Sequence, residues 1–338
     1  MRSWYLAFPL LLTLSLTASG FDPRPVLGEP DMQATRVALD PGDPARVRTG
    51  RLTYLGGVRL SSRDSAFGSF SAMLLEGDRF TLVSDRGNVV RFRMGADFVP
   101  REIAFADLPG GPGRGWLKRE RDAESMARDP ATGKVWIAFE SASTIWRYAP
   151  GLARHEAEIW PRAMREWTDN KGPESMARLP DGAFVILAEG RAKGGGHEGL
   201  RWSGDPLVAP DAVVKFRYVP PPGYEPSDAA ALPDGRILVL NRRFEVSRAL
   251  FSAKLTVIDS RAIRPGAVLR GAEVGTLARP LLHDNFEALA VSREGDATIV
   301  WIASDDNQQF WERTLLLKFR LEPGQAKSPL PAPETGSR

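Results

Sequence analysis

Short apolar runs alternate with turn residues along most of this chain. Two segments share the run Glu-Ser-Met-Ala-Arg, at residues 124–128 and 174–178. Each is followed, after a turn, by a second apolar run, at residues 134–140 and 183–189. Apolar runs of this length, rich in Val, Ile and Phe and bounded by Pro, Asp and Gly, predict antiparallel strands.

The same unit recurs in three further copies, which begin near Phe70, Pro226 and Asn285. Later segments of each unit predict a third strand, at residues 89–94, 144–148, 213–218, 255–258 and 314–321. Fourth strands are predicted at residues 102–105, 156–160 and 273–277. A unit of about 40 to 50 residues with four strands has the size of a propeller blade, so the sequence predicts an all-β, single β-propeller.

The two ends of the repeat array complement each other. The last copy ends after its third strand, while residues 51–60 form a strand-like segment with no unit in front of it. We expect these segments to pair and close the ring, which protects the sheet edges. Five repeats are visible in the sequence, and a sixth, degenerate repeat stays an alternative. The predicted propeller covers residues 51–323, between an extended segment at 21–50 and a disordered tail at 324–338.

Aligning the copies places polar residues at two recurring positions. One precedes the apolar run of the first strand, and the other ends the second strand. The first series is Glu124, Glu174, Asp228 and Glu287, with Ser71 in the weakest copy. The second series is Asp85, Glu140, Glu189, Asn241 and Asp305. Because the two strands are antiparallel and joined by a short turn, both series should lie at one mouth of the central channel.

Two interpretations of these acids stay open. Repeated acids can cap turns or accept hydrogen bonds from backbone amides, which stabilises every blade in the same way. Alternatively, converging carboxylates form a site for a hard cation such as calcium, which takes six to eight oxygen ligands. The candidate metal ligands are Glu124, Glu174, Asp228, Glu287, Asp85, Glu140, Glu189 and Asp305.

Basic residues next to the second series are candidates for binding a small anionic substrate. They are Arg86, Arg191, Arg242 and Arg243. Arginine offers a planar fork of donors that matches phosphate and carboxylate. Two Gly-rich insertions, at residues 109–121 and 190–211, lie at or beside this end and are typical of binding loops. The second carries His197, a weak candidate for acid-base chemistry, and no motif identifies a catalytic nucleophile.

Composition removes several classes of function. The net charge is only +3, and no run of five or six like charges occurs, so nucleic acid is not an expected partner. The absence of cysteine excludes disulfides, thiolate metal sites and cysteine nucleophiles. Residues 1–20 place Arg2 before an apolar stretch and small residues, the outline of a signal peptide cleaved after Gly20. We therefore expect a periplasmic or secreted protein, monomeric and without a membrane span after cleavage.

Three motifs of this chain resemble the phytase-like family, known as "esterase-like activity of phytase". They are the repeated Glu-Ser-Met-Ala at 124–127 and 174–177, Ser84-Asp85-Arg86-Gly87 and Phe286-Glu287-Ala288-Leu289. The resemblance covers roughly residues 51–322. It implies an exported β-propeller that hydrolyses phosphate or other esters, with calcium as in propeller phytases. The alternative is a non-catalytic propeller that binds a periplasmic ligand or protein, because a fold alone does not define a function.

Overall fold

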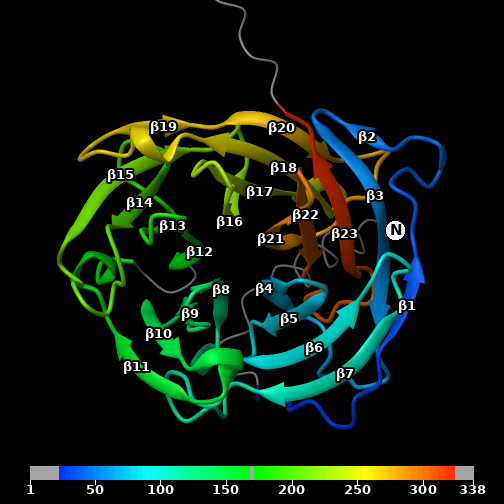
Figure 1. Cartoon of the computed structure of the whole chain (residues 1–338), viewed down its shortest axis with the longest axis horizontal. Coiled ribbons are helices and arrows are strands. Elements are labelled where there is room, and N and C mark those ends of the chain that lie inside the picture. The colour runs from blue at the N-terminus through cyan, green and yellow to red at the C-terminus, as the bar shows by residue number, and fades with distance from the viewer. Residues whose placement is uncertain (1–22, 168–170, 324–338) are drawn as a thin grey trace, which may run out of the picture.

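The computed structural model describes residues 23–167 and 171–323, which form five β-sheets around a central axis (Figure 1). The predicted all-β propeller is confirmed, and the described residues form five blades. In the described ranges, the helical segments are all short 3-10 turns, and none could cross a membrane. The predicted signal peptide and C-terminal tail lie outside the described residues.

The strands of each blade follow one another along the chain. Blade 1 contains β4 (Phe70–Glu76), β5 (Arg79–Ser84), β6 (Asn88–Met94) and β7 (Pro100–Asp107). Blade 2 contains β8 (Ala123–Arg128), β9 (Val135–Phe139), β10 (Thr144–Tyr148) and β11 (His155–Ile159). Blade 3 contains β12 (Pro173–Arg178), β13 (Phe184–Arg191), β14 (His197–Trp202), β15 (Val213–Val219) and β19 (Val268–Arg270). Blade 4 contains β16 (Glu225–Ala231), β17 (Ile237–Glu245), β18 (Leu250–Ile258) and β20 (Ala272–Leu277).

Blade 5 joins the two ends of the chain. It contains β21 (Phe286–Glu294), β22 (Ala297–Ser304), β23 (Thr314–Leu321), β3 (Leu52–Ser61), β1 (Gln33–Arg36) and β2 (Arg48–Thr49). Strand β3 pairs with β23 from Leu52 opposite Leu321 to Leu60 opposite Thr314, so the predicted closure is confirmed. Strand β1 then pairs with the outer edge of β3, which covers that edge with part of the N-terminal segment.

The first strand of every blade lines the axis. Strands β4, β8, β12, β16 and β21 each contact the next one around the ring, and β21 contacts β4 (Figure 1). Apolar side chains of the second strands fill the spaces between blades, as where Trp136 of blade 2 packs edge-on against Phe184 of blade 3. Phe80 of blade 1 and Trp301 of blade 5 make the same kind of contact. The residues at the ends of the inner strands therefore line the central channel.

Blade 3 differs from the sequence-based prediction. The third strand is β14, which lies inside the segment 190–211 that the sequence presents as a loop. The segment predicted as third, residues 213–218, is the fourth strand, β15. Gly194, Gly195 and Gly196 have positive φ and form a tight turn that leads directly from β13 into β14. The glycines thus belong to a hairpin, not to a long loop.

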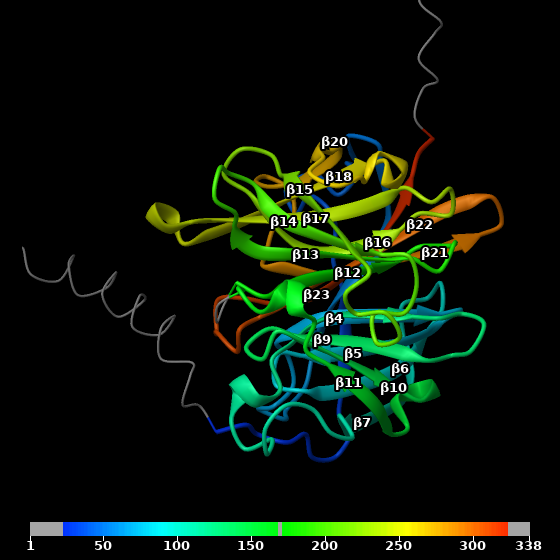
Figure 2. The same cartoon turned by 90° about the vertical axis from the view of Figure 1, so that its left-hand side faces the viewer.

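Short 3-10 turns connect several strands. They are η2 (Lys118–Glu120), η3 (Pro150–Leu152), η4 (Arg162–Met164), η5 (Val246–Arg248) and η6 (Ser260–Ala262). Several long connections extend from one side of the disc, the left-hand side of Figure 2. One of them, residues 109–121, includes η2 and reaches the candidate site described next.

Candidate functional site

A β-bulge interrupts the first strand of every blade at one equivalent position. In blade 2 the pairing of β8 with β9 steps from Ala123 to Ser125, so Glu124 is the extra residue. The equivalent extra residues are Ser71, Glu174, Ser227 and Glu287. A bulge leaves one residue out of the ladder and re-aims its side chain. The five bulges therefore form one ring of residues around the channel, which we call the bulge ring.

A second ring comes from each second strand, from the residue after the one that pairs with the residue before the bulge. Its members are Asp85, Glu140, Glu189, Arg242 and Asp305. In blades 1, 2, 3 and 5 the backbone N–H of this acid donates to a carbonyl just before the first strand, as from Glu140 to Asp122 over 2.9 Å. We call this set the strand-end ring. The two rings together form the mouth of the channel.

Blade 4 does not fit the alignment made from the sequence. The register places Ser227 in the bulge ring and Arg242 in the strand-end ring, one residue before Asp228 and one after Asn241. Asp228 instead accepts hydrogen bonds from the backbone N–H groups of Ala229 and Leu289, each over 2.7 Å. Asp228 therefore links blade 4 to blade 5, as expected for a backbone acceptor.

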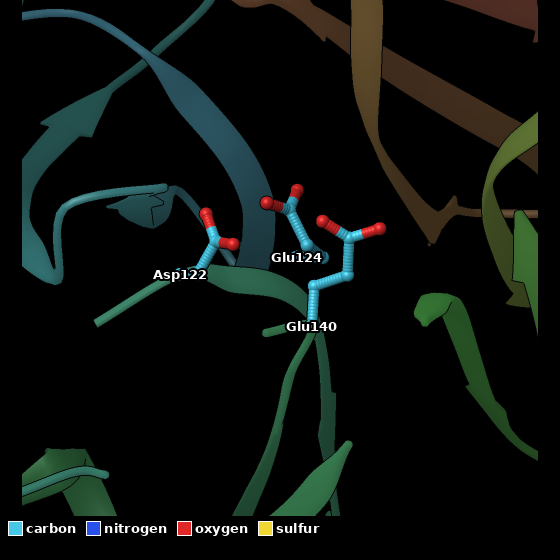
Figure 3. Close-up of side chains that lie close together, drawn as sticks. All are labelled: Asp122, Glu124 and Glu140. Carbon is cyan, nitrogen blue, oxygen red and sulfur yellow. The ribbon is translucent and has the colours of Figure 1, made fainter. Parts of the chain in front are cut away.

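Carboxylates converge most closely in blades 2 and 3. Ligand oxygens of Asp122, Glu124 and Glu140 lie within 4.8 Å of one another, and so do those of Glu140, Glu174 and Glu189. We call these sets the Asp122 triad and the Glu174 triad, and Glu140 belongs to both. Figure 3 shows the three carboxylates of the Asp122 triad gathered on one side of the ribbon of blade 2.

Two of these carboxylates, Glu124 and Glu174, are buried without an ion-pair partner among the described residues. Glu124 is 8% exposed and Glu174 is 5% exposed, and within the described residues neither side chain accepts a hydrogen bond or forms an ion pair. Burial first, and then the neighbouring carboxylates, raise the pKa of both groups well above the usual range. Burial and the charge of Asp122 and Glu189 raise the pKa of Glu140 to about 8. This part of the mouth favours either protons or a cation.

Arg242 of blade 4 forms ion pairs with acids of the blades on either side of it. Its guanidinium donates to Glu189 of blade 3 over 2.8 Å, to Glu287 of blade 5 and to Asn285 over 3.1 Å. Despite its burial, these carboxylates hold the pKa of Arg242 above its already high usual value, so it stays charged. Arg242 thus occupies a strand-end position itself and neutralises an acid in each neighbouring blade.

A lysine from the insertion 109–121 compensates blade 1. Lys118 of η2 forms an ion pair with Asp85, with Nζ 2.5 Å from Oδ2. Burial still raises the pKa of Asp85, while Lys118 lowers it. Asp305 has a pKa raised well above its usual range by burial and by Glu287, and its carboxylate accepts from the N–H of Asn307 over 2.6 Å.

The other sequence-predicted residues lie in different settings. Arg86 follows Asp85, and its side chain is 12% exposed. Arg191 is exposed and lies 3.6 Å from Glu225, and Arg243 is exposed. His197 is buried in β14, where Nδ1 lies 3.1 Å from the carbonyl oxygen of Ala188 and burial lowers the pKa of the ring. Its described contacts thus anchor the neighbouring strand.

Sequence reasoning did not select Asp122, Lys118 or Asn285 as site residues. Asp122 carries the clearest signal, because it stands two residues before Glu124 in the same repeat. Lys118 belongs to an insertion that the sequence marked as a binding loop, but its partner Asp85 lies 33 residues earlier. Only the fold brings these two residues together.

The fold and the mouth define a five-bladed propeller with a buried acidic site that is partly neutralised by Arg242 and Lys118. The chain belongs to the phytase-like family, because the profile described as "Esterase-like activity of phytase" matches residues 65–308. The resemblance seen in the repeated motifs is thereby confirmed. No curated protein matches the chain.

Several solved structures are similar to this chain. Hydrazine synthase of Kuenenia stuttgartiensis is 14% identical, with a TM-score of 0.39, over 74% of this chain and 71% of that one. A glucose dehydrogenase is 11% identical, with a TM-score of 0.40, over 79% of this chain and 98% of that one. A luciferin-regenerating enzyme is 10% identical, with a TM-score of 0.40, over 89% of this chain and 91% of that one.

Proposed function

We propose that this protein is a calcium-dependent hydrolase of phosphate or other anionic esters, with its cation held by the two triads in blades 2 and 3. Membership of the phytase-like family supports ester hydrolysis. The observation that carries the metal assignment is the pair Glu124 and Glu174, two buried carboxylates surrounded by other carboxylates. The leader-like sequence of residues 1–20 supports action in the periplasm or outside the cell.

The donor set fits calcium. Each triad offers carboxylate oxygens only, within 4.8 Å of one another. Calcium binds oxygen at about 2.3 to 2.6 Å, so two ligands on opposite sides of one ion lie about 5 Å apart. Calcium also accepts waters and substrate oxygens, which would complete a coordination shell of six to eight. Zinc is a poorer fit, because nitrogen and sulfur ligands are missing from both triads.

The remaining residues of the mouth would bind and orient an anionic ester. A bound calcium ion would supply charge neutralisation and acidify a water molecule. As calcium ligands, Glu124 and Glu174 would be ionised and would hold the ion, and with it the attacking water, beside the ester. Lys118 of the loop 109–121 and Arg86, which follows β5 of blade 1, would attract the negative group of the substrate. Arg242 would hold the carboxylates of Glu189 and Glu287 in place.

The test compares calcium binding in matched variants. Glu124→Gln with Glu174→Gln should abolish the rise in melting temperature caused by calcium, because a ligand that binds only the folded state stabilises it by mass action. The same pair should remove hydrolysis of a phosphomonoester such as p-nitrophenyl phosphate. The control is Asp228→Asn, whose carboxylate accepts two backbone N–H groups. It should lower stability equally with and without calcium.

Two results would contradict the proposal. If the double variant keeps the full calcium response, the triads do not hold the ion. If the wild type binds calcium but hydrolyses no phosphate, carboxylate or lactone ester, the non-catalytic ligand-binding propeller becomes the better description.

A further inference from the structure

The first described residues of the chain are fastened to the loop that carries Lys118. Pro23 forms an isolated antiparallel bridge with Leu117. The backbone N–H of Arg24 donates to the carbonyl of Trp116 over 2.9 Å. The N-terminal segment therefore acts as a short extra strand against residues 109–121.

The side chain of Arg24 joins three separate segments. Its Nε donates to the carbonyl of Gly115 over 3.1 Å, and Nη1 donates to the carbonyl of Arg86 over 3.0 Å. The guanidinium also forms a two-pronged ion pair with Asp107 at the end of β7, with Nη2 2.5 Å from Oδ2. The Arg24 side chain is only 6% exposed. Such forked, charge-assisted contacts are among the stronger polar interactions in proteins.

The loop itself has little regular structure to hold it. Between Pro109 and Arg121 its only helical element is the three-residue η2, and four of its residues are glycines with positive φ. Glu120 shapes the turn internally, since its carboxylate accepts the N–H of Trp116 over 2.8 Å. Tyr148 of blade 2 fixes the start of the loop by donating to the carbonyl of Gly110 over 3.1 Å. The contacts of Arg24 at Gly115 and Trp116 fix the part next to Lys118.

The charge of Lys118 acts both on a cation bound in the mouth and on an anionic substrate bound there. Its ammonium group pairs with Asp85, and the charges of Asp122 and Glu124 also act on it. Its positive charge opposes a cation held by the Asp122 triad and attracts an anionic substrate. Displacing Lys118 should therefore change these two affinities in opposite directions.

We propose that Arg24 is a positioning residue of the site: it clamps residues 109–121 so that Lys118 stays at Asp85 beside the cation site. The part that concerns calcium and substrate rests on the proposed function. The clamp of the loop stands on the contacts alone. Although Arg24 lies far from the mouth residues in sequence, it sets the balance between cation affinity and anion affinity there.

The experiment compares Arg24→Met, Lys118→Met and the double variant in the full processed protein. In Arg24→Met, hydrogen exchange of residues 109–121 should rise about tenfold, while the strands of the blades keep their protection. The calcium dissociation constant should fall about fivefold by calorimetry, and KM for p-nitrophenyl phosphate should rise about fivefold with a smaller change in kcat. Lys118→Met should produce both affinity shifts, and the double variant should add nothing further.

A matched control is Arg46→Met, which removes another arginine of the N-terminal segment, one that lies 3.4 Å from Asp40. It should leave all these quantities unchanged. Unchanged exchange of residues 109–121 in Arg24→Met would overturn the clamp even if the wild type binds calcium. If Arg24→Met weakens the binding of both calcium and substrate, and its effects add to those of Lys118→Met in the double variant, Arg24 only stabilises the fold. That result would overturn the inference.

Failure of the proposed function gives a different result. In that case the wild type shows no calcium response and no hydrolysis, while the exchange of residues 109–121 still reports on the clamp. The mature N-terminus provides an independent check. Cleavage near Phe21, as the sequence predicts, retains Arg24, whereas a mature chain that begins beyond residue 24 would overturn the inference.

Discussion

Arg242 takes the place that a carboxylate holds in the other four blades, and this one residue changes the charge of the whole mouth. It contacts Glu189 on one side and Glu287 on the other. Removing one partner of a buried ion pair leaves an uncompensated charge, which is strongly destabilising. Arg242→Met should therefore lower the free energy of unfolding by about 3 kcal/mol at pH 7 without calcium. Added calcium should recover part of this loss.

The control for Arg242 is its neighbour Arg243, which is exposed. Arg243→Met should change the free energy of unfolding by less than about 0.5 kcal/mol. Urea unfolding of both variants, with and without calcium, measures the difference. Equal effects of the two substitutions would show that the contacts of Arg242 in the mouth contribute nothing to stability.

The one-residue slip in blade 4 shows what a single sequence can and cannot provide. Matching acid to acid aligns Asp228 with Glu174, whereas matching the prolines Pro173 and Pro226 aligns Ser227 with Glu174. The proline match is correct, because both prolines immediately precede the bulge. In a strand, a shift of one residue turns a side chain to the other face. Chemical similarity therefore misplaced Asp228 and Asn241, although the other acids of the two series are placed in the rings.

At the scale of elements, strand β14 is the clearest departure from the sequence pattern, and Gly199 explains why the strand packs as it does. A Cβ at Gly199 would lie 2.3 Å from the ring of Phe216 on the neighbouring strand β15. Glycine lowers the strand signal in the sequence, but here it makes room for an aromatic ring. The pattern of apolar residues could not predict this strand, since the reason for its glycine lies in a different strand.

Gly199→Ala should therefore destabilise the protein by about 1 to 3 kcal/mol through overpacking against Phe216. The matched control is Gly204→Ala, because a Cβ at Gly204 meets no atom within 4 Å. Thermal unfolding followed by circular dichroism would compare the two variants. A melting temperature for Gly199→Ala equal to that of Gly204→Ala would show that the Phe216 ring moves aside at no cost.

At the scale of the whole molecule, closure of the ring forces buried acids from different blades to share one channel. The blade repeat and the closure of the ring could be predicted from the sequence, because the repeats define the blade and the two end segments pair with each other. The strand order of blade 3 could not, because β14 lies in a segment that the sequence presents as a loop. The sequence does not predict which of the buried acids lack a positively charged partner. Their pairing depends on Arg242, which lies within β17, and on Lys118, which lies in an inserted loop.

The collected acids should make stability depend on pH in a defined direction. Glu140 has a pKa of about 8 in the folded protein against an ordinary value of 4.5, because of burial and the charges of Asp122 and Glu189. The N–H of Gly172 and the charge of Arg242 act in the opposite sense. Between these two pH values the folded state binds a proton that the unfolded state has lost. Without calcium, stability should therefore fall as the pH rises from about 5 to 8.

Calcium should reverse this trend, because it binds the ionised carboxylates and competes with protons for them. The rise in melting temperature caused by calcium should then be small at pH 5 and largest near pH 8. Glu140→Gln should weaken the pH dependence without calcium, leaving the part that comes from the other raised-pKa carboxylates, and should reduce the calcium response. Glu166→Gln, at an exposed position, should alter neither. Melting temperatures measured across this pH range test both statements. A calcium response that is equally large at pH 5 would mean that the ion binds away from the raised-pKa carboxylates of the mouth.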